Sequence, residues 1–98
     1  MVMGKVEDFG KVIKVVTELM DVTEQDVLGR ARTQEVVDAR WMVIYLMREK
    51  GYSTRQISKL ILHPERTVNH ALNAFSDRVK YSYNYLGNIL AIARKELL

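Results

Sequence analysis

The sequence predicts an all-α protein, a compact bundle of about six helices that contains a helix-turn-helix. Apolar residues recur at steps of three and four along most of the chain, which is the spacing of a buried helix face. Hydrophobic residues make up 48% of the composition, enough for a core, and one proline and five glycines leave little room for linkers. A length of 98 residues predicts one domain, 1–98.

Two helices are expected before the basic centre of the chain. Residues 5 to 20 carry a broad apolar stripe that includes Val6, Ile13 and Met20, so this segment is predicted to pack as an amphipathic helix. Thr23 then has the character of an N-cap for a short second helix that Gly29 ends.

The third helix is predicted from about Gln34 to Lys50, and it is the expected centre of the core. Residues 41 to 47 are apolar nearly all round, as in a helix surrounded by others. Trp41 is interpreted as core filling. Arg40 and Arg48 flank the apolar run and are expected to point outward, and Gly51 ends the helix.

Residues 53 to 75 are predicted to form the helix-turn-helix. Ser53 and Gln56 have the spacing of a capping box at the start of its first helix. Leu62 and His63 are assigned to the turn, and Pro64 is expected as the first residue of the second helix, where its missing N–H costs nothing.

The second helix of this motif has two contrasting faces. Val68, Ala71, Leu72 and Phe75 form an apolar face, and the opposite face carries the polar set Arg66, Asn69, His70 and Asn73. Arginine can pair with guanine and asparagine with adenine in a major groove, so this polar face favours DNA reading. The alternative interpretation is an ordinary amphipathic helix with a polar surface.

Positive charge is concentrated around this motif. The chain has a net charge of +3, and residues 30 to 66 hold eight basic against four acidic residues. That distribution is typical of nucleic-acid binding, although uneven charge also arises by chance. Residues 30 to 34 form a short basic loop, which either reaches phosphates or an adjacent minor groove or is a solvated connector.

The last segment is predicted to break or bend at Ser76 and Asp77 and to continue as a long amphipathic helix over 77–98. Its stripe contains Tyr81, Tyr85, Leu86, Ile89, Leu90, Ala93 and Leu97. The stripe either packs across the bundle or meets a second copy, as in a homodimer through the 77–98 helix. Tyr83 lies off the stripe and is expected to be exposed.

Several function classes are disfavoured by what the sequence lacks. Cysteine is absent, and neither of the two histidines has a partner four residues away, as a helical zinc site requires. We therefore expect no enzyme, metal, cofactor or small-molecule substrate. No apolar run approaches the roughly 20 residues that span a bilayer, and residues 1–10 lack the apolar core of a signal peptide, so the expected location is cytoplasmic and nucleoid-associated.

From about Val12 to Phe75 the chain resembles the C-terminal DNA-binding domain of the bacterial replication initiator DnaA. The order of segments carries this resemblance: the helix with VIKVV, the TEQDVLGRAR stretch, the run VVDARWMVIYLMRE and then the helix-turn-helix. The resemblance implies an all-α domain that binds double-stranded DNA in replication initiation or its regulation. It covers about two thirds of the chain, which is then a stand-alone domain or part of a longer protein.

The resemblance also assigns candidate DNA contacts. Arg32, Arg40 and Arg48 match positions where the family has basic residues on the DNA backbone and minor groove, and Thr54 and Arg55 match the start of a helix that approaches a phosphate. Thr67, Val68 and His70 match residues of the family's recognition helix. With the polar face and the local charge, the predicted DNA-binding set is Arg32, Arg40, Arg48, Thr54, Arg55, Lys59, Arg66, Thr67, Asn69, His70 and Asn73.

The turn departs from the family pattern. The family has a Gly-Gly-Arg-Asp-His-Thr-Thr type of sequence there, and this chain is about one residue shorter. Pro64 and Glu65 replace the Asp and His that read bases in the family, and Trp41 replaces a Gln after the helix-opening Arg. The target sequence therefore stays open. The alternatives to a replication role are a protein-interaction module on a helix-turn-helix scaffold and a transcriptional regulator.

Overall fold

The computed structural model describes residues 4–98, so the first three residues of the predicted domain 1–98 lie outside the described residues. It confirms the all-α class: within residues 4–98 there are six α-helices, one π-helical turn and no strand. The elements are α1 Lys5–Met20, α2 Glu24–Leu28, α3 Gln34–Glu49, α4 Thr54–Ile61, α5 Glu65–Tyr81, the π-helical turn η1 Tyr83–Gly87 and α6 Asn88–Glu96. None of the described helices is long and apolar enough to cross a membrane.

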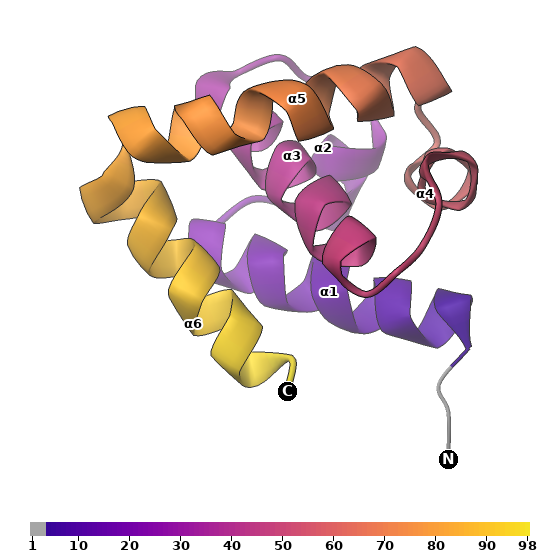
Figure 1. Cartoon of the computed structure of the whole chain (residues 1–98), viewed down its shortest axis with the longest axis horizontal. Helices are drawn as coiled ribbons and strands as arrows, with labels where there is room; N and C mark the ends of the chain where they lie inside the picture. The colour runs from indigo at the N-terminus through magenta and orange to yellow at the C-terminus, as the bar shows by residue number, and fades with distance from the viewer. Residues whose placement is uncertain (1–3) are drawn as a thin grey trace.

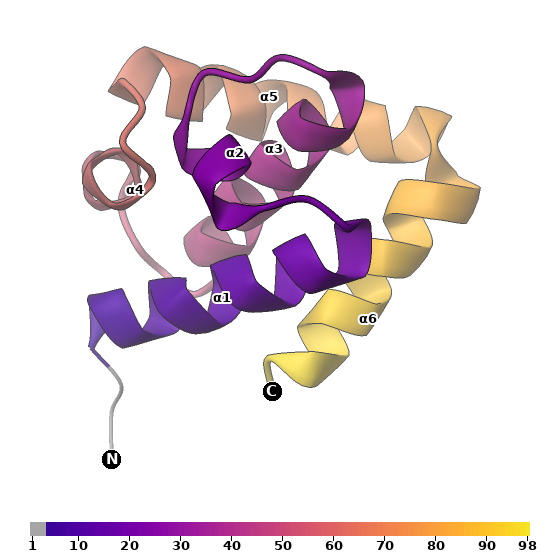
Figure 2. The same ribbon diagram turned by 180° about the vertical axis from the view of Figure 1, so that it is seen from behind.

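Helix α3 is the centre of the core, as its sequence predicts. It contacts α1, α2, α4 and α5, and both ribbon views show it between α5 and α1 (Figures 1 and 2). Met42, Val43, Ile44 and Met47 are fully buried. A helix buried on nearly all sides gives the surrounding elements one common surface to pack on.

The helix-turn-helix consists of α4, the turn at residues 62–64 and α5. Ser53 and Gln56 form the predicted capping box: the Ser53 hydroxyl accepts from the Gln56 N–H, and the Gln56 side chain accepts from the Ser53 N–H. Leu62 occupies the left-handed region, with φ of 63°. Its side chain packs little, because 64% of its surface is exposed. The turn is closed by the Ser58 hydroxyl, which donates to the His63 carbonyl at 2.5 Å.

The predicted position of Pro64 is wrong by one residue. Pro64 is the N-cap of α5, with ψ of 154°, and the helix begins at Glu65. Its carbonyl accepts from the N–H groups of Thr67 and Val68, so proline starts the helix from outside it rather than from its first helical position.

The predicted break at Ser76 and Asp77 is also wrong, because α5 continues to Tyr81. Ser76 and Asp77 are exposed, so neither competes for a place in the core, while Phe75 before them is fully buried. The chain changes direction at Ser82 instead, and η1 leads into α6. At this bend a side chain on Gly87 would meet the exposed Tyr83 ring at 2.9 Å, so any larger residue there would require that ring to move.

The apolar stripe of the last segment packs within the chain. Leu86, Ile89, Leu90 and Ala93 are buried, and α6 lies against α1 (Figure 2). Tyr81 and Tyr85, which were placed on the same stripe, are exposed because η1 interrupts the helical spacing. Tyr83 is exposed as predicted.

Candidate nucleic-acid interface

Helix α5 separates its two faces as the sequence predicts. Val68, Ala71 and Phe75 are fully buried against the core. The predicted base-reading residues Arg66, Asn69, His70 and Asn73 are all exposed. The burial pattern leaves one side of α5 available to a ligand over its first three turns.

The basic loop between α2 and α3 lies at the same end of the molecule as α5 (Figure 2), and its arginines line one hollow with Thr67 near the start of α5. Arg30 and Arg32 are exposed at this loop. Gly29, just before it, could not be another residue without movement, because a side chain there would come within 2.9 Å of the Gln25 carbonyl. The loop therefore leaves α2 along a path that glycine makes sterically possible.

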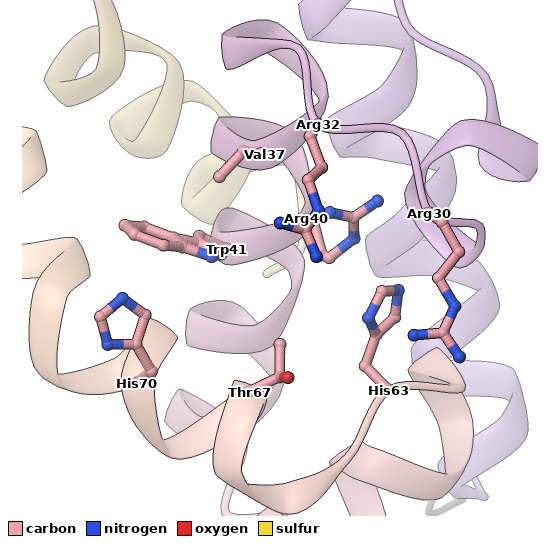
Figure 3. A pocket seen from close by; sticks show the side chains of 8 residues that line it. All are labelled: Arg30, Arg32, Val37, Arg40, Trp41, His63, Thr67 and His70. Atoms are coloured by element: carbon pink, nitrogen blue, oxygen red, sulfur yellow. The ribbon is translucent and has the colours of Figure 1, made fainter.

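A hollow of about 440 Å³ lies between the basic loop, α3 and α5. Figure 3 shows that the basic loop, α3 and α5 all contribute side chains to it. Its lining residues are Arg30, Arg32, Val37, Arg40, Trp41, His63, Thr67 and His70. Four of the predicted DNA-binding residues, Arg32, Arg40, Thr67 and His70, thus line one space.

Arg40 does not point outward, so the prediction for its side chain is wrong. The residue is only 5% exposed, and its guanidinium donates to four carbonyls around the end of α2 and the basic loop. The acceptors are Val27 at 2.8 Å, Asp26 at 2.9 Å, Gly29 at 3.1 Å and Ala31 at 3.1 Å. Arg40 satisfies through Nε and Nη2 backbone groups that no helix or sheet pairs, so it fixes the loop, while its Nη1 donates to no group among residues 4–98.

Arg40 also adds to the positive charge that gathers around the hollow. Burial lowers the pKa of Arg40, and the nearby charges of Arg30 and Arg32 lower it further. Three guanidinium groups thus line one small space (Figure 3). Such a concentration of positive charge favours an anion at this place.

His63 is both a turn residue, as predicted, and part of the hollow. It is 8% exposed, and its buried Nε2 has no hydrogen-bond partner among residues 4–98. Burial lowers the pKa of His63, with further lowering by Arg40 and Arg30, and the carbonyls of Gly29 and Val27 oppose this shift. The imidazole is therefore held toward its neutral form.

His70 connects α5 to the α3 wall of the hollow. Its ring meets Trp41 edge to face, with centroids 5.5 Å apart and an interplanar angle of 81°. Trp41 packs partly against the core but also lines the hollow, so core filling describes only part of its role. The contact restrains the orientation of a side chain that faces the candidate ligand surface.

The remaining predicted residues lie outside the hollow. Arg48 is exposed in the last turn of α3 and donates to the Tyr52 carbonyl at 3.0 Å. Arg55 and Lys59 are exposed on α4, and Thr54, the first residue of α4, is half-buried. These residues are carried by the helix-turn-helix and by the helix that leads into it.

Sequence reasoning did not include Arg30 or His63 among the site residues. Arg30 belongs to the basic loop and stands two residues before Arg32, so its position in the sequence indicates a role in the same site. His63 gave no such signal, because a turn residue acquires its neighbours from tertiary contacts with α2 and α3 rather than from helical spacing.

The comparisons agree with the geometry. A family model described as "Bacterial dnaA protein helix-turn-helix" matches residues 9–74, which is more than half of the chain. The match spans α1 from Phe9 through most of α5 and therefore includes the hollow and the polar face of α5. A search of curated proteins and a search of solved structures gave no match.

Proposed function

Because the chain belongs to the bacterial DnaA helix-turn-helix family, we propose that it binds specific sequences of double-stranded DNA in replication initiation or its regulation. The family is a non-catalytic one that binds double-stranded DNA, and we propose no enzyme activity for this member. The observation that carries the proposal is the exposed polar face of α5 beside the basic loop.

In this proposal α5 lies in the major groove. Asn69 and Asn73 stand one helical turn apart and are both exposed, so each amide can reach an adenine edge. Arg66 is exposed in the first turn and suits a guanine. Thr67 and His70 lie at the border between this face and the hollow, where bases and backbone are both within reach.

Exposed basic residues on the neighbouring elements would hold the backbone. Arg32, Arg48, Arg55 and Lys59 are the exposed members of the predicted phosphate set, and Thr54 lies with them at the start of α4. Arg40 is buried and is not counted with these exposed residues, although its Nη1 is not used by the four carbonyl contacts. Four neutralised phosphates give a log–log salt slope of about −3.6 on B-form DNA.

The altered turn leaves the target sequence as the main question. Fluorescence anisotropy with a labelled initiator-box duplex and a scrambled duplex, each over a salt series, addresses it. A preference for the box would mean that box reading survives Pro64 and Glu65, and equal steep binding to both would support DNA binding without that specificity. Lack of binding to either duplex at low salt would contradict the proposal.

Variants on α5 and α4 separate base reading from phosphate contacts. Asn69→Ala should reduce affinity by about 1–3 kcal/mol for the preferred duplex and change little on the scrambled one. Asn84→Ala in η1 is the matched control, because this asparagine is also exposed but lies beyond the end of α5. Arg55→Ala should weaken both duplexes equally and reduce the salt slope by about one.

A second role in protein interaction is favoured by the bend after α5. Tyr81, Tyr83 and Tyr85 are exposed by 90%, 68% and 48%, a concentration of aromatic surface that a second copy or another protein could cover. A homodimer through 77–98 would use these tyrosines together with the exposed Ile92 and Leu98, since Leu86, Ile89, Leu90 and Ala93 of the stripe are buried. Sedimentation velocity at high concentration tests it, and a monomer would contradict it. A nucleoid-associated, cytoplasmic location follows from the DNA-binding proposal.

A further inference from the structure

The hollow between the basic loop and α5 combines two features that point to one ligand chemistry. Its charged lining residues are Arg30, Arg32 and Arg40, and no carboxylate lines it among residues 4–98. His63 lines the same space, and its buried Nε2 has no hydrogen-bond partner among residues 4–98. Buried polar atoms are normally paired, so an unpaired one beside a cationic cluster calls for a missing partner or a missing charge.

His63 is surrounded by groups that oppose its protonation in the free protein. Arg40 from α3 and Arg30 from the loop both lower its pKa, in addition to burial. The acidic residues that could offset these charges are Glu24 and Asp26 on α2 and Glu65 at the start of α5. None of the three lines the hollow or contributes to the shift.

The structure nevertheless provides acceptors for a protonated His63. The carbonyls of Val27 and Gly29 act on the imidazole in the direction that raises its pKa. Both carbonyls also accept from Arg40, and a carbonyl oxygen can accept two hydrogen bonds. The obstacle to protonation is therefore burial beside positive charge, and an anion in the hollow would remove the electrostatic part of it.

We propose that the hollow takes a phosphate group and that His63 takes up one proton from solvent when the phosphate binds. The inference rests on the proposed function where the phosphate belongs to the DNA backbone. A free anion of the same chemistry could fill the hollow as well. In either case binding converts His63 from the neutral imidazole to the imidazolium, and affinity for the anion rises as pH falls.

The first experiment follows the imidazole signals of the whole chain by NMR. The chain has two histidines, so the variant His70→Gln assigns both signals unambiguously. Titrations between about pH 5.5 and 8, where unperturbed histidines change charge, would be recorded for the free protein, with labelled duplex, and with inorganic sulfate. Sulfate imitates a phosphate dianion and keeps its charge over this range.

The expected result is a higher pKa of His63 in the presence of duplex. If sulfate raises it too, the hollow accepts a free anion, and if only duplex does, the ligand is a backbone phosphate. Duplex binding that leaves the pKa of His63 unchanged, together with no effect of sulfate, would overturn the inference but not the proposed function. A shift with sulfate alone, without duplex binding, would support the hollow and contradict the proposed function.

The second experiment measures how the affinity for duplex depends on pH. Anisotropy of the duplex over the same pH range should show affinity increasing toward acid, about tenfold for each unit by which binding raises the pKa of His63. His63→Gln should remove that increase. Asn84→Ala, the exposed control in η1, should retain it. An unchanged pH profile in His63→Gln would overturn the inference, and should that variant fail to fold, the NMR titration decides alone.

Discussion

Arg78 forms a two-point ion pair with Asp38, from Nε to Oδ1 at 3.0 Å and from Nη2 to Oδ2 at 3.1 Å. The Asp38 side chain is only 4% exposed, and Gln34 donates a third hydrogen bond to it at 2.9 Å. The pair joins the second half of α5 to the beginning of α3. The helix with the candidate base contacts is thus fixed to the core helix through a buried carboxylate.

Breaking this pair from one side should be costly. Arg78→Ala leaves Asp38 buried with Gln34 alone, and we expect the free energy of unfolding to fall by about 2 kcal/mol, below the roughly 3–5 kcal/mol of fully buried pairs because Arg78 is partly exposed. Urea denaturation measures the change. The double variant Arg78→Ala with Asp38→Asn should recover part of the loss, and strict additivity of the two substitutions would contradict the coupling.

Removing Arg40 should reduce stability, whereas removing Arg32 should reduce DNA binding. Arg40→Ala removes four hydrogen bonds to carbonyls and should lower the free energy of unfolding by about 2–4 kcal/mol. Arg32→Ala, at an exposed position, should leave stability within about 0.5 kcal/mol and weaken DNA binding. Thermal unfolding and anisotropy on both variants check this, and a fully stable Arg40→Ala protein would mean that the carbonyl contacts do not hold the loop.

Arg40→Lys tests the geometry of the same contact. Lysine keeps the charge but lacks the planar fork that reaches several carbonyls at once. We expect this variant to lose most of the stability that Arg40→Ala loses. Stability equal to that of the unchanged chain would show that charge alone suffices.

Leu62 offers a stabilising substitution. It holds φ of 63°, a conformation in which a side chain is strained by about 1–2 kcal/mol, and its own side chain is largely exposed. Leu62→Gly should therefore raise the free energy of unfolding by about 1 kcal/mol. Leu62→Ala keeps the strain and should give no such gain. Destabilisation by glycine would indicate that the leucine side chain contributes more packing than its exposure indicates.

The stability of the ligand-free protein should depend on His63 in mildly acidic solution. Its pKa is lowered by folding, so below the ordinary histidine pKa of about 6.5 the unfolded chain binds more protons than the folded one. Stability should then decrease as pH falls through this value, and it should level off once the folded pKa is passed. Urea midpoints over a pH series measure the slope, which His63→Gln should reduce.

The parts of the fold set by local spacing were predictable from the sequence. The helix boundaries near Ser53 and Gly51, the buried face of α5 and the central place of α3 follow from caps, glycine and apolar periodicity. Ser76 and Asp77 misled the prediction, since polar residues on an exposed helix face resemble a helix end. Only the tertiary contacts of Phe75 and Arg78 show that α5 continues.

The candidate site was less predictable, because its key features come from chain segments meeting in space. The exposed members of the polar face could be named from helical spacing alone. Arg40 and Arg48 have the same charge and flank the same apolar run, yet Arg40 is buried on loop carbonyls and Arg48 is exposed. The difference depends on where the end of α2 crosses α3, which no pattern along a single helix contains.

The carbonyl contacts of Arg40 also determine the state in which the basic loop meets a ligand. Fixing the backbone of one residue costs about 1–2 kcal/mol of conformational entropy, and a free arginine-rich linker bears that cost at the moment of association. Here Asp26, Val27, Gly29 and Ala31 are already held by a buried guanidinium. The loop is therefore preorganised during folding, and Arg30 and Arg32 can engage a ligand with only their side chains left to order.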